Sequence, residues 1–487
     1  MKISVVSGEI VQHATPMLVL GTWDGESLPT MVSNLLEVSD WYGRFKQMAL
    51  LYPRGAIAAK RVLLLGLGKR AQFTTDRLHE LAAVAAQQAR SHQLESFTFV
   101  LPVTDGVAIS ATAQAIAEGS ILGLYRFQEF KSELKPEDQH AIAEMFILAS
   151  SAAEEAIKGA ELGEIIARGT LLARDLANRP GNALVPATLA EIAQELGVNK
   201  GLNVTVLGPA ELTAQGFGGI LGVGQGSANP PRFIVMEYGE NKKSDLPTIC
   251  LVGKGITFDT GGISIKPAEN MELMKMDMGG AAAVLGTMQV VAEMKPAVHV
   301  IGLIASAENM PGPNAYKPGD ILKTLSGKTV EVINTDAEGR IVLADALFYA
   351  QRYKPAAIID LATLTGAITV ALGPHAIGLM SNNDELAQRV LDASNTSGER
   401  AWRLPLWDPY REMVKSDVAD IKNSTGRLGG SITAAAFLEN FVGDYPWVHL
   451  DIAGTAWTDA RPRAYTPKGA TGIGVRLLAE LIMSWLN

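Results

Sequence analysis

The chain has 487 residues, of which 47% are hydrophobic and 19% charged, and its formal net charge is −9. This length exceeds what one hydrophobic core usually organises, so two globular domains are expected. The acidic balance excludes an overall basic footprint for nucleic acid, and the single cysteine, Cys250, excludes a disulfide within the chain. The apolar stretches are short for a membrane span and the first residues lack a signal-peptide pattern, which predicts a cytoplasmic protein with no membrane partner.

The first 150 residues alternate strand-like and helix-like segments. Residues 61–65 have the pattern of a buried strand, and they run into the turn-like sequence of residues 66–68. Residues 76–90 place Leu and Ala on one helical face, and residues 97–101 form the next strand-like run. This alternation predicts a smaller α/β domain over residues 1–150.

A long helical pattern follows the first domain. It covers residues 151–177 and ends at the stop signal of residues 178–182, so we interpret it as a linking helix. Residues 178–487 again alternate strands with helices, which predicts a larger α/β domain with a mostly parallel or mixed central sheet flanked by helices. The strands expected there are residues 203–207, 232–237, 248–252, 298–305, 357–361 and 447–452.

The most informative stretch is the heptapeptide Asn334-Thr335-Asp336-Ala337-Glu338-Gly339-Arg340. It lies between a strand-like run and a helix-like run, at residues 330–333 and 341–350. Carboxylates two residues apart on a loop can converge on one metal ion, and a nearby arginine can hold an anion. The alternative is a capping box, with Thr335 as N-cap and Glu338 reaching back. That alternative does not explain Asp336 and Arg340 together.

A second polar cluster lies about 75 residues upstream. Lys254 and Asp259 belong to a glycine-rich turn expected at residues 253–262, and Lys266 and Asp277 follow. Each has a structural alternative: Asp259 can cap local amides, Lys266 can be a solvated surface residue, and Asp277 can be an N-cap. The spacing of a phosphate-binding loop is absent. Together with the heptapeptide, the cluster indicates a two-metal hydrolase.

With these residues assembled, the chain resembles the leucine aminopeptidase family, also called cytosol aminopeptidases, in particular its bacterial-type leucyl aminopeptidases. The heptapeptide is that family's signature. The similarity also includes the segments Val252–Gly262, Thr363–Gly366 and His449–Gly454, and it extends from about Arg174 to the C-terminus. The resemblance implies that residues 178–487 are the catalytic domain. The first domain shows much weaker similarity, and a role in assembly or regulation is implied for it.

The resemblance implies two divalent ions per subunit, Mn²⁺ or Zn²⁺ with Mg²⁺ as a further option. Asp259 and Glu338 would bridge the two ions, and Asp336 would complete the more exchangeable site. Lys254 and Asp277 would complete the tighter site, and Lys254 would have to be neutral there.

The reaction implied by the resemblance is hydrolysis of the first peptide bond of a peptide with a free N-terminus, through a water bridged by the two metals. Lys266 would stabilise the oxyanion, and a bicarbonate ion held by Arg340 would act as general base. A preference for Leu and other apolar first residues and a homohexameric assembly are also expected. The implied substrate-binding residues are Lys266, Asp277, Asn334, Met274, Thr363, Gly366 and Ala453.

Two other functions remain open from the sequence. A two-metal phosphoesterase could use the same carboxylates, because two lysines and an arginine beside them suit phosphate. Some bacterial members of the resembled family also bind DNA. Acidic residues slightly outnumber basic ones over residues 1–160, so we expect DNA binding to be subordinate to peptidase activity.

Overall fold

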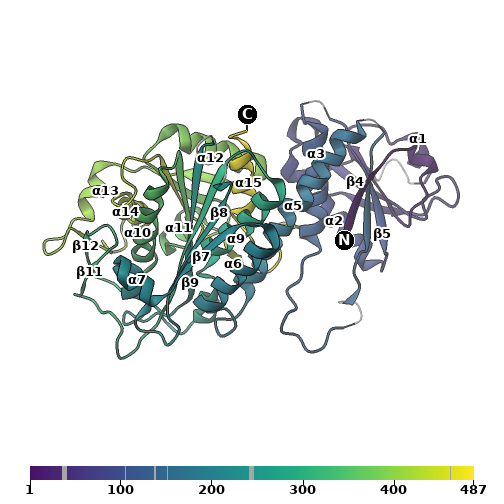
Figure 1. Cartoon of the computed structure of the whole chain (residues 1–487). Helices are drawn as coiled ribbons and strands as arrows, with labels where there is room; N and C mark the ends of the chain where they lie inside the picture. Colours follow the sequence, from purple (N-terminus) through teal and green to yellow (C-terminus); the bar gives the residue numbers. More distant parts are fainter. Residues whose placement is uncertain are drawn as a thin grey trace. The chain divides into compact units, whose positions relative to one another are not determined.

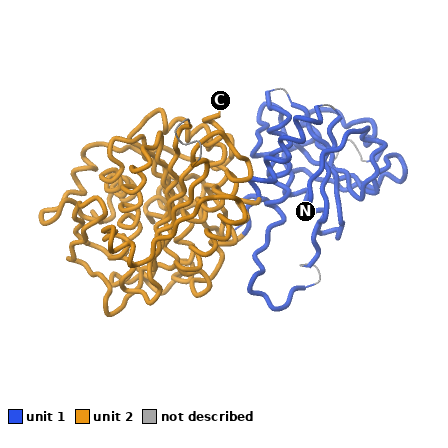
Figure 2. The backbone as a smooth tube through the Cα atoms, viewed as in Figure 1, with its two compact units in different colours: residues 1–167, 460–467 blue, residues 168–459, 468–487 orange. Residues whose placement is uncertain are grey.

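The computed structural model describes residues 1–35, 41–104, 106–135, 139–150, 152–240, 246–460 and 462–486. The chain forms two compact units (Figure 2), residues 1–167 with 460–467, and residues 168–459 with 468–487. The predicted fold class, two α/β domains with a mixed sheet in the larger, is confirmed. Helix α5 covers Ala153–Asn178. Residue 151, where the linking helix was expected to begin, lies outside the described residues, and the predicted three-part division stays a prediction.

The N-terminal unit is built on a six-stranded sheet with the order β1-β6-β5-β2-β4-β3. Only β3 runs antiparallel to its neighbour, and the remaining pairs are parallel. All seven residues of β4 are buried, as their apolar run predicts. The strands are β1 (Lys2–Val6), β2 (Leu18–Trp23), β3 (Met48–Leu51), β4 (Val62–Gly68), β5 (Ser96–Val100) and β6 (Glu144–Leu148), and the helices are α1 (Thr30–Ser33), α2 (Thr75–Ser91) and α3 (Ile109–Gly123).

A short segment close to the C-terminus completes this unit. The Tyr465 hydroxyl donates to Asp76 Oδ1 over 2.6 Å, and the Ala464 amide donates to Glu80 Oε1 over 2.9 Å. The Gln87 side chain donates to the Ala464 carbonyl over 2.7 Å. All three partners lie on α2, so residues 460–467 are fastened along one helix of the N-terminal unit.

The larger unit contains an eight-stranded mixed sheet with the order β15-β14-β17-β13-β9-β10-β8-β7. Its centre, β10-β9-β13-β17, is parallel, whereas β8, β7 and β14 pair antiparallel. The strands are β7 (Asn203–Leu207), β8 (Arg232–Tyr238), β9 (Thr248–Asp259), β10 (His299–Asn309), β13 (Ala357–Ala362), β14 (Ile377–Ser381), β15 (Ala401–Arg403) and β17 (Trp447–Asp451).

Helices cover both faces of this sheet (Figure 1). Side chains alternate along β9, so Val252 packs with α10 in one hydrophobic core while Gly253 faces α9. The helices are α6 (Pro186–Lys200), α7 (Pro209–Gln215), α8 (Gly218–Gly224), α9 (Gly279–Met294), α10 (Gly339–Ala350), α11 (Gly366–Leu372), α12 (Asp384–Ser397), α13 (Asp408–Met413), α14 (Gly430–Glu439) and α15 (Val475–Met483). Smaller sheets contain β11 (Ile321–Lys323), β12 (Thr329–Glu331), β16 (Ile421–Lys422), β18 (Trp457–Thr458) and β19 (Gly469–Ala470).

The first part of the glycine-rich sequence after residue 252 is strand, contrary to the sequence-based expectation, and the turn begins only after Asp259, where Gly261 and Gly262 have positive φ. Strand β9 continues through this first part and pairs with β10 as far as Asp259. Gly253 is required there for packing, because an added Cβ would lie 2.7 Å from the Gly280 carbonyl oxygen of α9. The glycine therefore allows a helix to approach a strand, and the strand carries Asp259 to its end. None of the described helices has the length and hydropathy of a membrane span.

Asp345 on α10 is a buried carboxylate that organises two other segments. It accepts hydrogen bonds from the Ile220 amide over 2.9 Å and the Leu325 amide over 2.7 Å, and a third from the Gly219 amide. Burial raises the pKa of Asp345 to about 7, although these amides act to lower it. The side chain is fully inaccessible to solvent.

We expect Asp345→Ala to destabilise the protein by about 3 kcal/mol, because buried amides would lose their acceptor. Asp345→Asn, which keeps one acceptor oxygen, should cost less. The raised pKa means that the folded protein retains a proton which the unfolded chain has lost. Stability from this group is therefore complete below pH 4 and is lost as the pH rises towards 7.

Urea unfolding of the wild type and Asp345→Asn between pH 4 and 7.5 checks both points. The stability of the wild type relative to the Asn variant should fall as the pH rises through this window. A difference independent of pH would contradict the assigned pKa.

Candidate active site

The carboxyl ends of the parallel strands meet at one edge of the large sheet. Strands β9, β10 and β17 end at Asp259, Asn309 and Asp451, and β13 ends just before Thr363. Ligand sites of open α/β sheets lie at this edge, because the loops that follow each strand gather there. The polar cluster predicted from the sequence is assembled at this position.

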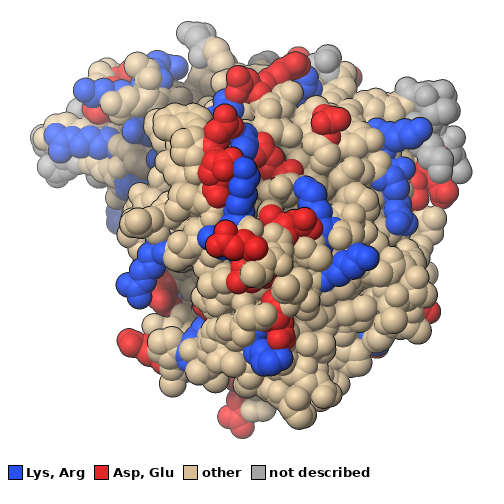
Figure 3. All heavy atoms as spheres, turned by 90° about the vertical axis from the view of Figure 1, so that its left-hand side faces the viewer, with Lys and Arg blue, Asp and Glu red and all other residues tan. Residues whose placement is uncertain are grey.

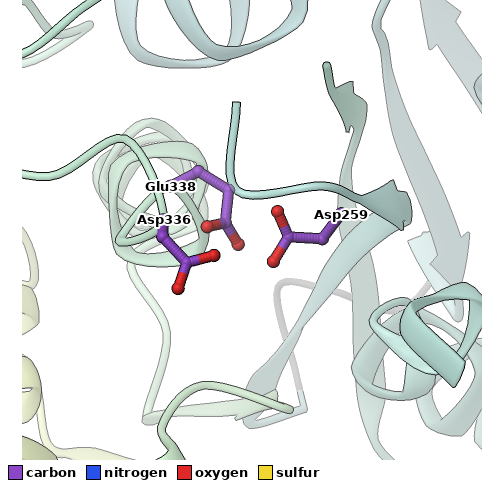
Figure 4. Close-up of side chains that lie close together, drawn as sticks. All are labelled: Asp259, Asp336 and Glu338. Carbon is purple, nitrogen blue, oxygen red and sulfur yellow. The ribbon is translucent and has the colours of Figure 1, made fainter. Parts of the chain in front are cut away.

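Three carboxylates converge at this edge. Asp259 comes from the end of β9, and Asp336 and Glu338 come from the loop that leads into α10 (Figure 4). Their ligand oxygens all lie within 4.8 Å of one another. Asp259 and Glu338 are buried, whereas Asp336 is partly open to solvent. A group of this kind fits a divalent cation, which prefers oxygen ligands from several carboxylates.

A fourth carboxylate, that of Asp277, lies beside this group, and Lys254 contacts both Asp277 and Glu338. Its Nζ lies 2.7 Å from Asp277 Oδ2 and 2.8 Å from Glu338 Oε1, and it donates to the Thr363 carbonyl over 3.0 Å. Lys254 lies within β9, and Asp277 lies between η5 (Met271–Met276) and α9. The side chains of Lys254 and Asp277 are both almost fully buried.

Lys266 faces the group from its more open side. Its Nζ lies 2.8 Å from Asp259 Oδ2 and 2.5 Å from Asp336 Oδ1. The side chain of Lys266 is 22% exposed, against 3% for Lys254, so only Lys266 is accessible to a molecule arriving from solvent. The two lysines therefore differ in environment although both contact the same carboxylates.

Burial is the largest cause of the pKa shifts of the charged groups in this site. It raises the pKa of Asp277, Glu338 and Asp336, and neighbouring carboxylates raise each of them further. Burial lowers the pKa of Lys254, but Asp277, Glu338 and Asp259 raise it more, so the net shift is upward. Burial lowers the pKa of the Arg340 guanidinium to about 10. The site is thus a compact charged cluster held out of water.

Gly339 in the heptapeptide makes room for the Lys254 side chain. A Cβ at this position would lie 2.5 Å from Lys254 Cε and 2.6 Å from its Nζ. The glycine therefore lets α10 begin directly above the lysine, which places Glu338 within contact distance.

The sequence left open that Thr335, Asp277 and Asp259 only cap helices or local amides, and the structure answers differently for each. Thr335 is not an N-cap: its hydroxyl donates to the Gly261 carbonyl over 2.5 Å and accepts from the Ser264 amide over 2.8 Å. The N-cap residue of α9 is Met278, so Asp277 does not cap this helix. Instead, Asp277 Oδ1 accepts a hydrogen bond from the Thr363 hydroxyl. Asp259 does accept from the Gly261 amide through Oδ1, and its Oδ2 contacts Lys266 as well.

Asn309 is a site residue that the sequence analysis missed. It is fully buried and donates to Asp259 Oδ1 over 2.8 Å and to the Thr335 carbonyl over 3.0 Å. The Tyr316 hydroxyl donates to the same carbonyl over 2.8 Å. The only sequence signal was a polar pair, Glu308 and Asn309, directly after an apolar run on the strand next to β9.

The residues expected to bind substrate lie in several places around the carboxylates. Asn334 and Gly366 line a cavity of about 830 Å³ together with Asp336 and Arg340. Thr363 is nearly buried and bonded to Asp277. Met274 and Ala453 do not line this cavity. The Met274 carbonyl accepts from the Asp277 amide, and the Ala453 amide donates to Asp451.

Asp451 connects two of these segments. Its Oδ1 accepts from the amides of Leu364 and Ala453, each over 3.2 Å, and its Oδ2 accepts from the Thr365 hydroxyl over 2.6 Å. The side chain is 1% exposed. One buried carboxylate therefore fixes the loops that follow both β13 and β17.

The donor set of this site fits metal ions. Four carboxylates and two lysines lie together, so the acidic groups outnumber the basic ones. Glu338 Oε2 is buried and has no hydrogen-bond partner among the described residues. A buried unpaired carboxylate oxygen is costly unless a cation or a donor reaches it.

Comparison with known proteins agrees with this geometry. Residues 171–479 match the family model described as cytosol aminopeptidase family, catalytic domain, and residues 23–134 match the corresponding N-terminal domain. The chain belongs to the cytosol aminopeptidase family. It is therefore a hydrolase of the peptidase class, a metal-dependent exopeptidase.

Individual relatives cover nearly the whole chain. A protein of Roseiflexus castenholzii (strain DSM 13941 / HLO8) named "Probable cytosol aminopeptidase" is 62% identical over 486 residues, covering 100% of this chain and 99% of that protein. A solved structure of the bottromycin maturation enzyme BotP in complex with Mn has a TM-score of 0.88 and 36% identity, with 97% and 100% coverage. A mutant tomato leucine aminopeptidase has a TM-score of 0.89 and 36% identity, with 99% and 96% coverage.

We expect Asn309→Ala to weaken divalent metal binding by about 10- to 100-fold, because Asp259 would lose the donor that orients it. The measurement is a Mn²⁺ titration against a competing chelator. Ser306→Ala is the matched control: Ser306 is buried on the same strand, and its hydroxyl has no partner among the described residues. Equal metal affinity in both variants would show that Asn309 does not orient the site.

Proposed function

We propose that this protein removes the N-terminal residue from peptides with a free amino group and prefers Leu and other apolar first residues. The observation that supports this most directly is the convergence of four carboxylates, two lysines and Arg340 at the carboxyl edge of the large sheet. The set offers ligands for cations, a buried acid for an amine and an accessible ammonium for a carbonyl oxygen.

The site would hold two divalent cations, Mn²⁺ or Zn²⁺ with Mg²⁺ as a further option. Asp259 and Glu338 would contribute to both positions, Asp336 to one, and Lys254 and Asp277 to the other. As a ligand Lys254 must release its proton, which two nearby dications favour. When bound, the ions supply Lewis-acid activation of a water molecule, and a bicarbonate on Arg340 supplies its general base.

The substrate amine is assigned to Asp277. Its carboxylate is almost fully buried, and the Thr363 hydroxyl fixes it through a 2.7 Å hydrogen bond. A buried acid is complementary to an ammonium or amine, and it has no equivalent favourable contact with an acylated terminus. This placement accounts for a requirement for an unblocked N-terminus.

Lys266 is assigned to the carbonyl oxygen of the scissile bond. Its Nζ is the only one of the two site ammonium groups that is accessible, and Asp259 and Asp336 hold it in place. Its charge would stabilise the negative charge that develops on that oxygen, a contribution that commonly amounts to 10²–10³ in rate.

Arg340 is assigned to binding bicarbonate. It lines the cavity beside Asp336, and its Nε is buried without a hydrogen-bond partner among the described residues. A guanidinium binds a planar oxyanion through paired N–H donors, so the chemistry of the side chain suits this ion.

First-residue selectivity is assigned to the partly apolar surroundings formed by Met274, Thr363, Gly366 and Ala453.

We also propose a homohexamer in the cytoplasm, with the N-terminal unit serving assembly. We rank DNA binding below peptidase activity as a function of this protein. On the face of the molecule in Figure 3, basic and acidic side chains are interspersed, and neither sign covers the surface continuously.

Removal of metal with a chelator should abolish hydrolysis of leucyl-p-nitroanilide, and addition of Mn²⁺ or Zn²⁺ should restore it. The N-acetylated substrate should stay uncleaved under both conditions, because its amine is blocked. Assays of the stripped and reloaded protein measure both effects. Full activity in protein shown by elemental analysis to contain no metal would contradict the proposal.

Lys266→Ala should lower kcat by about 10²–10³ with a smaller effect on KM, since the lost interaction develops in the transition state. Steady-state kinetics with leucyl-p-nitroanilide provide the test. Lys317→Ala, which removes an exposed lysine paired with Asp320, serves as the matched control and should leave kcat unchanged. A Lys266→Ala enzyme with near-normal kcat would refute the assigned role.

A further inference from the structure

The cavity beside the carboxylates is closed on one side by the loop between β16 and α14. At its start, Asn423 ties this loop to the heptapeptide segment. The Asn423 side chain donates to the Asn334 carbonyl over 2.6 Å and accepts from the Ile333 amide over 2.8 Å. The first end of the loop is therefore fixed to the same segment that carries Asp336 and Arg340.

The second end of the loop is fixed to the segment after β13. The hydroxyls of Ser431 and Thr365 lie 2.8 Å apart, and Thr365 is bonded in turn to Asp451. Gly430 packs so closely on α11 that an added Cβ would lie 3.0 Å from the Ala367 Cβ. Both ends of the loop are thus held against the walls of the cavity, which restricts where its tip can lie.

Arg427 lies at the tip of this loop and lines the cavity with Asp336 and Arg340. Arg427 is exposed, and it forms no ion pair or hydrogen bond with another described residue. Asp336 is the only acidic residue among those that line the cavity, and it already contacts Lys266. Arg427 therefore presents an uncompensated positive charge to the cavity.

We propose that Arg427 binds the free C-terminal carboxylate of short peptides, so that dipeptides are the preferred substrate class. This inference rests on the proposed aminopeptidase function. With the amine and the scissile bond at the carboxylate cluster, we place the residue after that bond in the part of the adjoining cavity that Arg427 lines. In a dipeptide the chain ends there, about one residue length of 3.5 Å further on. A longer peptide has a neutral amide at the same place, and Arg427 can form no ion pair with it.

The experiment compares Leu-Leu with Leu-Leu-amide, which differ only in the charge at the C-terminus. Wild-type protein loaded with Mn²⁺ should show a kcat/KM about three- to fivefold higher for the free acid, the size expected for a partly exposed ion pair. The difference should lie in KM and decrease at high salt. Arg427→Gln should reduce the ratio to about one and leave hydrolysis of the amide unchanged, whereas Arg427→Lys should retain part of it.

Lys323→Gln is the matched control, because it removes one exposed positive charge of the same unit outside the cavity. It should keep the wild-type ratio. A wild-type ratio of one, or an Arg427→Gln variant that loses acid and amide hydrolysis equally, would overturn the inference while the peptidase function stands. Absence of hydrolysis of both peptides by the wild type would instead contradict the proposed function itself.

Discussion

The repulsion between buried carboxylates is the constraint on which the rest of the site depends. Asp259, Asp277, Asp336 and Glu338 lie together, and burial raises the pKa of three of them. Two lysines offset only part of their charge. Such a cluster is unfavourable unless cations occupy it, so the fold must hold the acids in place by other means. Stability gained elsewhere in the large unit offsets the cost of holding these acids together.

The scaffold provides this support through rigid elements. Asp259 stands at a strand end, Glu338 stands directly before α10, and Asp277 lies between η5 and α9, so backbone hydrogen bonds fix the chain close to these acids. Asn309 and Thr335 hold the loops around Asp259 together, and Gly339 allows α10 to begin above Lys254. Sites built on strands and helices keep their geometry better than sites on free loops. The charged groups therefore remain close although they repel one another.

Much of this arrangement followed from local sequence. The apolar runs predicted the strands of the large sheet except β14 and β15, and the heptapeptide marked the start of α10. Gly253 and Gly255 were misread, because a glycine needed for close packing has the same local signature as one in a turn. Asn309 could not be found from its own neighbours. Its contacts depend on β10 lying beside β9, which is decided by tertiary structure.

The contribution of residues 460–467 to the N-terminal unit has a consequence for biosynthesis. Asp76, Glu80 and Gln87 on α2 each form a hydrogen bond with this segment, which is translated after nearly all of the catalytic unit. Domains usually mature in the order in which they leave the ribosome. Here the first domain to emerge remains unfinished until the second has been synthesised. Cell-free expression of chains stopped before residue 460 would thus yield an N-terminal unit that is more sensitive to protease than the same unit in the full chain.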